Sequence, residues 1–251
     1  MKISVITVTY NSENSIGRTI ESVLGQQIRT AADGPEIEYL IIDGNSTDGT
    51  IEKVESYREA LEEKGISLRI CSEPDQGIYD AMNKGIQLAC GDVIGILNSD
   101  DWYEPDALQT VADTFADGQC ELMFSHIWIH KRNGKSFVKK ARLSRYETSR
   151  NWNHPTTFVR ADVYKENPFK NWGIHDDYGF FLRMRRQNKK IVVVDKVLAN
   201  FCIGGVSNRK DWKSAKKRIM DRYRYCYRVN GYSRLYMIEC VMMEVVKMIT
   251  G

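Results

Sequence analysis

The feature that most constrains the fold is the regular alternation of strand-like and helix-like segments over the first 115 residues. The stretches 3–9, 38–43 and 92–97 are rich in β-branched and apolar residues without a clean polar alternation, and a shorter strand is expected at 67–72. Such runs are typical of strands buried on both faces of a parallel sheet. Helical apolar spacing separates them, so the chain predicts βαβ units with right-handed crossovers.

The pattern changes after residue 115. The elements expected beyond it are a strand, a hairpin turn, a helix and a last strand, at 121–129, 132–135, 178–186 and 190–195. Both halves are expected to share one sheet. The predicted fold class is therefore α/β, with a Rossmann-like, mostly parallel central sheet flanked by helices, a mixed C-terminal half and a C-terminal helical tail.

The amino-acid composition is that of a globular protein rather than a membrane-spanning one. Apolar residues make up 42% of the chain and charged residues 27%, which is the balance of an ordinary globular protein. The most apolar stretch, residues 236–250, is interrupted by Glu239, Glu244 and Lys247, so no transmembrane helix is expected. The six cysteines have no zinc-ligand or CxxC spacing, and the N-terminus runs directly into a strand. These features predict reduced thiols in a cytoplasmic protein.

Polar side chains follow each of the first four predicted strands. They are Thr9, Tyr10 and Asn11 after the first strand, Asp43 after the second, Glu73 and Asp75 after the third, and Asn98, Ser99, Asp100 and Asp101 after the fourth. Ligands of open α/β sheets bind beyond the carboxyl ends of the strands, so these groups are expected to build one site. Neither a glycine-rich dinucleotide loop nor a P-loop occurs. An acidic site of this kind needs a cation to accept a phosphorylated ligand, and carboxylates suit Mg²⁺ or Mn²⁺.

Each of these acids also has a plainer interpretation. Asp43, with Gly44 and Asp48, could form only a turn and a helix cap, and the helix is expected to begin near Thr47 or Asp48. Asp100 and Asp101 could be solvated loop acids before a helix. The presence of polar groups at four strand ends favours a site, in which Asp43 would accept hydrogen bonds from a base or a ribose.

Several stretches resemble the inverting, family 2 glycosyltransferases with the GT-A fold. They are ISVITVTYNSENSIGRTIESVLGQ, IIDGNSTDGT, SEPDQGIYDAMNKGIQLACGDVIGILNSDDWYEPDAL, HDDYGFFLRM and FCIGGVS. The resemblance implies a GT-A domain over 1–208, with a nucleotide-binding half (1–115) and an acceptor-binding half (116–208), followed by a basic helical tail (209–251). It also implies transfer of a sugar from a nucleoside diphosphate, expected to be UDP, onto an acceptor hydroxyl, with Mn²⁺ or Mg²⁺ as cofactor.

The resemblance also implies roles for individual residues. Thr9 and Tyr10 match the pocket for the nucleotide base, and Asp43 matches the acid that contacts it. The remaining residues expected to bind the donor are Asp75, Asp80, Asn98 and Ser99. Asp100 is the last acid of the DxD position and would bind the metal, whereas Asn98 replaces the first acid and can still bond a ribose. Asp177 falls where the family places its catalytic base.

Four further assignments have alternatives. Asp176 could be the base if the register slips by one residue. His154 is expected near the donor diphosphate, unless it is a structural histidine, and Trp172 is a candidate for stacking on an acceptor sugar, unless its ring is simply core. The segment 204–207, Gly-Gly-Val-Ser, could close over the donor or be an ordinary turn.

The tail is strongly basic. Residues 209–234 contain ten Lys or Arg and two acids, Asp211 and Asp221. A basic helix with aromatic residues can lie on an anionic membrane, which would suit a lipid-linked glycan acceptor in polysaccharide or O-antigen biosynthesis. The plainer alternative is a solvated helix packed on the domain. No nucleic-acid partner is expected, because the chain contains no recognised module for one.

Two other functions compete with a transferase. A sugar nucleotidyltransferase would carry a glycine-rich N-terminal loop with basic residues, which is missing. An inactive sugar-nucleotide-binding protein is disfavoured by the presence of both Asp100 and Asp177.

Overall fold

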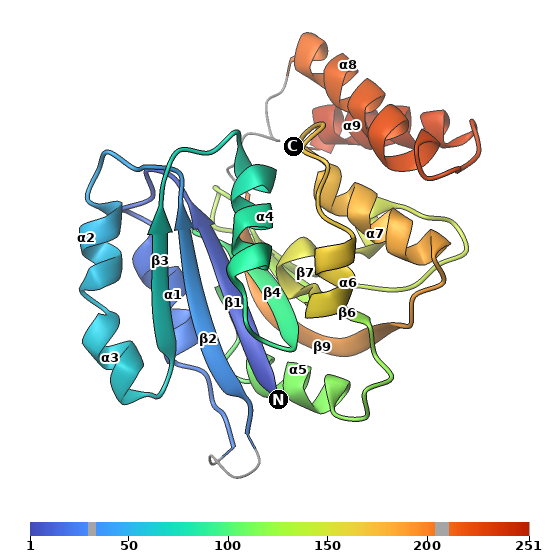
Figure 1. Cartoon of the computed structure of the whole chain (residues 1–251). Helices are drawn as coiled ribbons and strands as arrows, with labels where there is room; N and C mark the ends of the chain where they lie inside the picture. Colours follow the sequence, from blue (N-terminus) through green and yellow to red (C-terminus); the bar gives the residue numbers. More distant parts are fainter. Residues whose placement is uncertain (30–33, 204–210, 251) are drawn as a thin grey trace.

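The computed structural model describes residues 1–29, 34–203 and 211–250 (Figure 1). Within that part, nine strands form one sheet in the order β3-β2-β1-β4-β8-β6-β9-β5, with β7 paired to β6. The strands are β1 (Lys2–Thr9), β2 (Glu36–Asp43), β3 (Ser67–Ser72), β4 (Val93–Asn98), β5 (Trp102–Tyr103), β6 (Leu122–His130), β7 (Ser136–Lys139), β8 (Phe158–Arg160) and β9 (Ile191–Cys202). The predicted single sheet across both halves is confirmed.

The first four strands form the parallel part of the sheet. Strand β1 pairs in parallel with both β2 and β4, and β2 pairs in parallel with β3. The register places Thr9 opposite Asp43 and Asp43 opposite Ser72, while Val8 lies opposite Asn98. The four carboxyl ends therefore share one edge, called here the carboxyl edge, at the top of the sheet in Figure 1.

Helices cover both faces of this parallel part. The helices of the first half are α1 (Ile16–Leu24), α2 (Thr50–Glu55), α3 (Arg58–Glu63), α4 (Ile78–Leu88) and α5 (Ala107–Phe115). Helix α4 lies close on the sheet because Gly85 has no side chain. A Cβ at that position would lie 2.6 Å from Cγ2 of Ile6. This close packing fixes where the first turn of α4 begins, near the carboxyl edge (Figure 1).

The second half is mixed, as predicted. Strand β8 runs antiparallel to β4 and β6, and β9 runs parallel to β6 with an irregular register near Ser125 and His126. Strands β6 and β7 form the expected hairpin. The helical elements are η1 (Ser149–Asn151), η2 (His154–Thr156), α6 (Ala161–Glu166) and α7 (Asp176–Arg186). Strand β9 is longer than expected because, beyond Asp195, it pairs with both β5 and β6.

One predicted helix start is wrong. Helix α2 begins at Thr50 rather than near Thr47 or Asp48. The Asp48 carboxylate accepts the Thr50 amide at 3.1 Å through one oxygen and the Glu13 amide at 3.2 Å through the other. Asp48 therefore tethers the loop to the segment after β1, and the helix starts two residues later.

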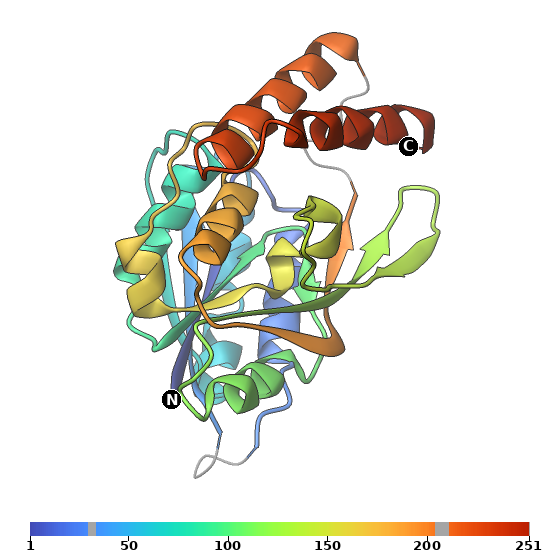
Figure 2. The same cartoon turned by 90° about the vertical axis from the view of Figure 1, so that its right-hand side faces the viewer.

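The tail forms a helical unit, called here the C-terminal helical unit. It consists of α8 (Trp212–Asp221), the π-helical segment η4 (Arg222–Arg228) and α9 (Tyr236–Thr250). It lies beyond the carboxyl edge, next to α7 (Figures 1 and 2). Helices α8 and α9 are joined by the buried pair of Arg218 and Glu244, whose closest atoms are 2.6 Å apart. No described helix is long and apolar enough to cross a membrane.

Candidate active site

Three segments meet around Gly44 at the carboxyl edge. A Cβ on Gly44 would lie 2.6 Å from Oδ2 of Asp75 and 3.4 Å from Cδ2 of Tyr10. The Tyr10 ring is 62% exposed. The absence of a side chain on Gly44 thus leaves room for Tyr10 and Asp75 to approach each other. An exposed ring beside a glycine offers a flat surface on which a planar base could stack.

Asp43 lies beneath this surface and is 1% exposed. Its carboxylate accepts the Ser46 amide at 2.9 Å, the Ser46 hydroxyl at 2.5 Å and the Ser72 hydroxyl at 2.6 Å. Asp43 therefore does close a turn, as its plainer interpretation expected. These bonds hold the ends of β2 and β3 together, and a ligand contact would use the lone pairs that remain.

Buried polar atoms without partners mark the ends of β1 and β4. Among the described residues, Oγ1 of Thr9, Oδ1 of Asn98 and Oδ2 of Asp101 are buried and form no hydrogen bond. Such atoms are rare in folded proteins, because each carries a desolvation cost of about 1–3 kcal/mol. The Ser99 hydroxyl, next to Asn98, donates to the Ser12 hydroxyl at 2.8 Å. A polar ligand group at either strand end would offer a partner to the atom buried there.

Asp100 and Asp101 have different environments. Asp101 is completely buried, so its interpretation as a solvated loop acid is wrong. Its Oδ1 accepts the Cys202 amide at 3.2 Å, and burial, reinforced by the neighbouring Asp100, raises its pKa well above the usual value. Asp100 is half-buried, and burial raises its pKa also. Arg18 donates to the Asp100 carbonyl oxygen at 3.2 Å and lies over the Trp102 ring, which fixes the loop.

The oxygen atoms of Asp100 and Asp101 suit a hard divalent cation. The Asp100 carboxylate is partly desolvated and receives no hydrogen bond from another described side chain, and the Asp101 Oδ2 atom beside it has no partner. Oxygen ligands of this kind are those that Mg²⁺ and Mn²⁺ prefer. No group of three or more His, Cys, Asp or Glu that could hold a metal occurs within the described ranges.

Asp177 is held at the first turn of α7. Its Oδ1 accepts the Tyr79 hydroxyl at 2.9 Å, and its Oδ2 lies 3.6 Å from Nδ1 of His154. The side chain remains 24% exposed. Burial lowers the pKa of His154, with Asp177 opposing the shift, and the other ring nitrogen, Nε2, is buried without a hydrogen bond among described residues.

Asp176 points elsewhere. It is buried, its Oδ2 accepts the Trp172 amide at 2.6 Å, and burial raises its pKa. The carboxyl group therefore closes the turn before α7. Trp172 is an exposed ring that packs against Tyr225 of the C-terminal helical unit, with ring centroids 5.7 Å apart. Because Asp176 is buried and bonded within this turn, Asp177 is the acid that is more available to an acceptor.

Most of the sequence-predicted residues lie along this edge. Segment η2, which carries His154, packs against β4, β6 and β9, and His154 lies 3.6 Å from Asp177 at the start of α7. Asp80 accepts the Gln76 amide at 3.0 Å and lies 3.6 Å from Lys84, so it holds the loop before α4. Residues 204–207 lie outside the described ranges.

Two residues beside Asp177 were missed in the sequence. Tyr79 adjoins Asp80 in the DAMNKG-like segment and is one of the buried residues of α4. Lys139 donates to the carbonyl oxygens of Ser149 and Trp152 at 3.0 and 2.7 Å. Burial lowers the pKa of Lys139 to about 8, and the charge of Asp177 opposes that shift. No sequence pattern pointed to Lys139.

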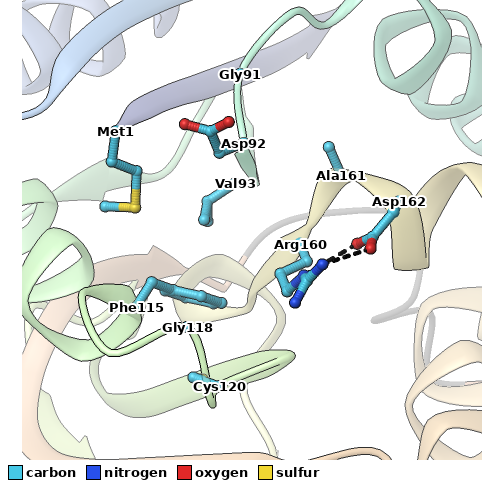
Figure 3. A pocket seen from close by; sticks show the side chains of 10 residues that line it. All are labelled: Met1, Gly91, Asp92, Val93, Phe115, Gly118, Cys120, Arg160, Ala161 and Asp162. Atoms are coloured by element: carbon cyan, nitrogen blue, oxygen red, sulfur yellow. Dashed lines mark hydrogen bonds and ion pairs between the residues drawn. The ribbon is translucent and has the colours of Figure 1, made fainter.

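A separate cavity lies at the opposite edge of the sheet (Figure 3). It has a volume of about 410 Å³ and is lined by residues including Met1, Asp92, Phe115 and Arg160. Its charged groups are satisfied: Arg160 pairs with Asp162 at 2.6 Å, and Asp92 accepts the Lys2 amide at 2.8 Å. None of the predicted site residues lines it.

The sequence comparison decides the family. The family model described as "Glycosyl transferase family 2" matches residues 4–192. The chain belongs to glycosyltransferase family 2. An uncharacterized glycosyltransferase of Nostoc sp. is 29% identical over 86% of this chain and 69% of its own length. Other curated relatives are matched over 11% to 60% of their own length, so the chain spans less than two thirds of each of them.

Solved structures agree with the family assignment at the level of the fold. The structure of S. aureus TarS 1–349 with UDP-GlcNAc has a TM-score of 0.63 at 20% identity, covering 98% of this chain and 72% of that one. The mannosyltransferase PcManGT from Pyrobaculum calidifontis, in complex with GDP-Man and Mn²⁺, has a TM-score of 0.65 at 14% identity, covering 100% and 70%. This glycosyltransferase therefore has the GT-A type of fold, as the sequence predicted.

Proposed function

We propose that this glycosyltransferase uses a nucleoside-diphosphate sugar, in the first instance a UDP-sugar, and inverts the anomeric centre with the help of Mn²⁺ or Mg²⁺. The observation that carries the proposal is the contrast at the carboxyl edge between unsatisfied polar atoms at the β1 and β4 ends and a firmly oriented carboxylate, Asp177. The neighbours solved with UDP-GlcNAc and with GDP-Man and Mn²⁺ support this class of donor and cofactor.

On the donor side, each strand end has a separate task. The base stacks on Tyr10 beside Gly44, with Asp43 and Asp75 as hydrogen-bond acceptors at its edge. The Thr9 hydroxyl and the side-chain oxygen of Asn98 form hydrogen bonds with the ribose or the phosphates, which gives these buried atoms the partners that they lack within the described chain. A divalent ion, when bound, would be held by Asp100 and would neutralise the charge of the leaving diphosphate.

On the acceptor side, Asp177 is the general base. Its carboxylate takes the proton of the acceptor hydroxyl as that oxygen bonds to the anomeric carbon from the face opposite the diphosphate. The bond from that carbon to the phosphate oxygen breaks with its electron pair on the diphosphate, so the configuration inverts in one displacement. Tyr79 donates a hydrogen bond to one carboxylate oxygen and so orients Asp177, while His154 lies 3.6 Å from the other oxygen.

The acceptor is proposed to be a glycan or a lipid-linked glycan in polysaccharide or O-antigen biosynthesis, used at the cytoplasmic side of a membrane. The resemblance to the family supports this class. Trp172 lies four residues before Asp176, and one face of a sugar could stack on its exposed ring. Residues 1–115 would bind the donor, and 116–208 the acceptor.

A donor panel tests the proposal. Purified protein is heated with each of several UDP- and GDP-sugars, with and without Mn²⁺, and the melting temperature is recorded. We expect metal-dependent stabilisation by one donor class and slow release of the nucleoside diphosphate from it. Release of pyrophosphate instead would indicate a nucleotidyltransferase. Stabilisation without any release, with acceptors present, would indicate a binding protein that has lost catalysis.

A further inference from the structure

Helix α9 has its polar side chains turned inward. Glu244 is 2% exposed and pairs with the equally buried Arg218. Glu239, half-buried, accepts the Thr148 hydroxyl at 2.6 Å. Lys247 is half-buried, and burial lowers its pKa. The two acids of α9 are thus used for contacts within the protein, whereas a surface helix normally presents such groups to water.

The outward side of α9 is apolar. Its exposed side chains include Ile238, Val241, Met242 and Val245, with Ile238 and Met242 each more than half exposed. Their spacing of i, i+3, i+4 and i+7 places them in one stripe along the helix. Leu235, just before the helix, is 72% exposed and extends it. We call these five residues the α9 stripe. A contiguous apolar stripe on a protein surface marks an interaction site.

Positive charge is exposed on the other parts of the same helical unit. The exposed basic side chains of α8, η4 and the turn before α9 are Lys213, Lys216, Lys217, Arg224, Arg228 and Arg234. None of them takes part in an ion pair between described residues. The exposed Trp212 opens α8. The unit thus combines an apolar helix face with positive charge that no acid of the described chain neutralises.

We propose that the α9 stripe lies in the surface of an anionic lipid bilayer, with the basic residues of α8 and η4 on lipid headgroups. An interfacial helix buries its apolar face about 5–10 Å into the headgroup boundary, and anionic lipids attract the flanking lysines and arginines. Charge complementarity favours this occupant over a second copy of the chain. Two copies joined through α9 would bring two sets of uncompensated positive charge toward each other.

This placement, which rests on the proposed function, would bring the acceptor side to the membrane. Segment η4 packs on α7, where the Cys226 thiol donates to the His175 carbonyl oxygen at 3.2 Å. Figure 2 shows α8 and α9 together on the same side of the molecule as the start of α7. A membrane-bound unit would therefore hold Asp177 near the bilayer, where the headgroup sugar of a lipid-linked acceptor would be found.

Vesicle sedimentation of the full chain tests the proposal. The vesicles are phosphatidylcholine alone, or with about 30% phosphatidylglycerol to supply negative charge. We expect binding to the anionic vesicles that weakens with salt. The triple variant Ile238→Ser, Met242→Ser, Val245→Ser should lose roughly tenfold in affinity for each side chain withdrawn from lipid. Replacing Lys213, Lys216 and Lys217 by Gln should cost about fivefold for each charge, on anionic vesicles only.

The control is Phe137→Ser, which removes an exposed aromatic ring from β7, outside the helical unit. It should bind like the wild type. Unchanged binding of the triple variant, or no binding of the wild type at low salt, overturns the proposal. A dimer in sedimentation velocity that the triple variant abolishes would assign the α9 stripe to a second copy and would also overturn it. Donor hydrolysis in every variant tests the proposed transferase separately, because none of the substituted residues belongs to the proposed donor site.

Discussion

The two edges of the sheet differ in how their polar groups are satisfied. At the amino edge, where β1 and β4 begin, a cavity of about 410 Å³ is lined by Arg160, Asp162 and Asp92, each with a partner. At the carboxyl edge, Thr9 and Asn98 bury oxygen atoms that form no hydrogen bond among described residues. The amino edge thus has a cavity whose charged side chains are all paired, whereas the carboxyl edge has buried oxygen atoms without partners in the described part of the chain.

This difference concerns what a ligand would gain at each edge. An unsatisfied buried atom destabilises the fold by about 1–3 kcal/mol, and a ligand at the carboxyl edge would offer a partner to those of Thr9 and Asn98; other such atoms in the described chain include those of Tyr103 and Trp152. A cavity lined by paired charges has no such deficit. The comparison predicts that substitutions at the carboxyl edge change function, whereas equivalent substitutions at the amino edge change little.

The largest effect is expected from Asp177→Asn. The amide cannot take the acceptor proton, so turnover should fall by about two to four orders of magnitude, the usual contribution of a general base. The donor dissociation constant should stay nearly unchanged, because Asp177 lies on the acceptor side. Steady-state kinetics and a donor titration measure the two quantities.

The matched control at the other edge is Asp162→Asn. Its exposed pair with Arg160 is worth at most about 1 kcal/mol of stability, so turnover should not change. Asp176→Asn separates the neighbouring acids. If Asp176→Asn removes turnover and Asp177→Asn does not, the base has been assigned to the wrong residue.

The next effect is expected from loss of the metal. Asp100→Asn, or chelation of the ion, should reduce turnover by about two to three orders of magnitude, as removal of one transition-state charge stabiliser does. Added Mn²⁺ should restore the chelated wild type but not the variant. Full activity in the presence of chelator would remove the metal from the mechanism.

The raised pKa of Asp100 also predicts how metal binding depends on pH. Burial raises the pKa of Asp100, so its carboxylate gains a proton at a higher pH than a free aspartate does. Only the ionised form binds a cation. Mn²⁺ affinity in the presence of donor should therefore fall as the pH drops through that raised pKa, and the fall should begin above the ordinary aspartate range.

Much of this edge could be predicted from the sequence because parallel strands bring their carboxyl ends together. The runs ending at Thr9, Asp43 and Asn98 are strongly β-branched and short, and their order along the chain fixes which ends meet. The turn residues after these strands gave a less certain prediction of function. The same acid, Asp43, closes a turn and lies at the site, and sequence alone could not separate the two roles.

What the sequence could not show depends on packing between distant segments. Asp100 and Asp101 are neighbours of the same type, yet only Asp101 is fully buried, because β9 supplies the Cys202 amide to it. Likewise, the inward acids of α9 depend on where Arg218 and Thr148 lie. The helical pattern of α9 was visible in the sequence, but its orientation was not.

A smaller effect is expected from Tyr79→Phe, which removes one hydrogen bond to Asp177. A bond to a charged group contributes about 1.5–3 kcal/mol, so kcat should fall by about 10- to 100-fold. The donor dissociation constant and the melting temperature should remain close to those of the wild type if Tyr79 positions the base. Equal losses in donor affinity and stability would instead indicate a general packing role in α4.

The smallest effect, and the sharpest for the comparison of the edges, is expected from Thr9→Val. Valine has nearly the same shape as threonine but lacks the Oγ1 atom that is buried without a partner. Removing this hydroxyl should raise the melting temperature of the free protein, because an unmet hydrogen bond disappears. Donor affinity should fall by about fivefold, because one neutral hydrogen bond to the ligand is lost. The two quantities should thus move in opposite directions, which simple damage to packing cannot produce. If both fall together, Oγ1 has a structural partner and the carboxyl edge resembles the amino edge more closely than argued above.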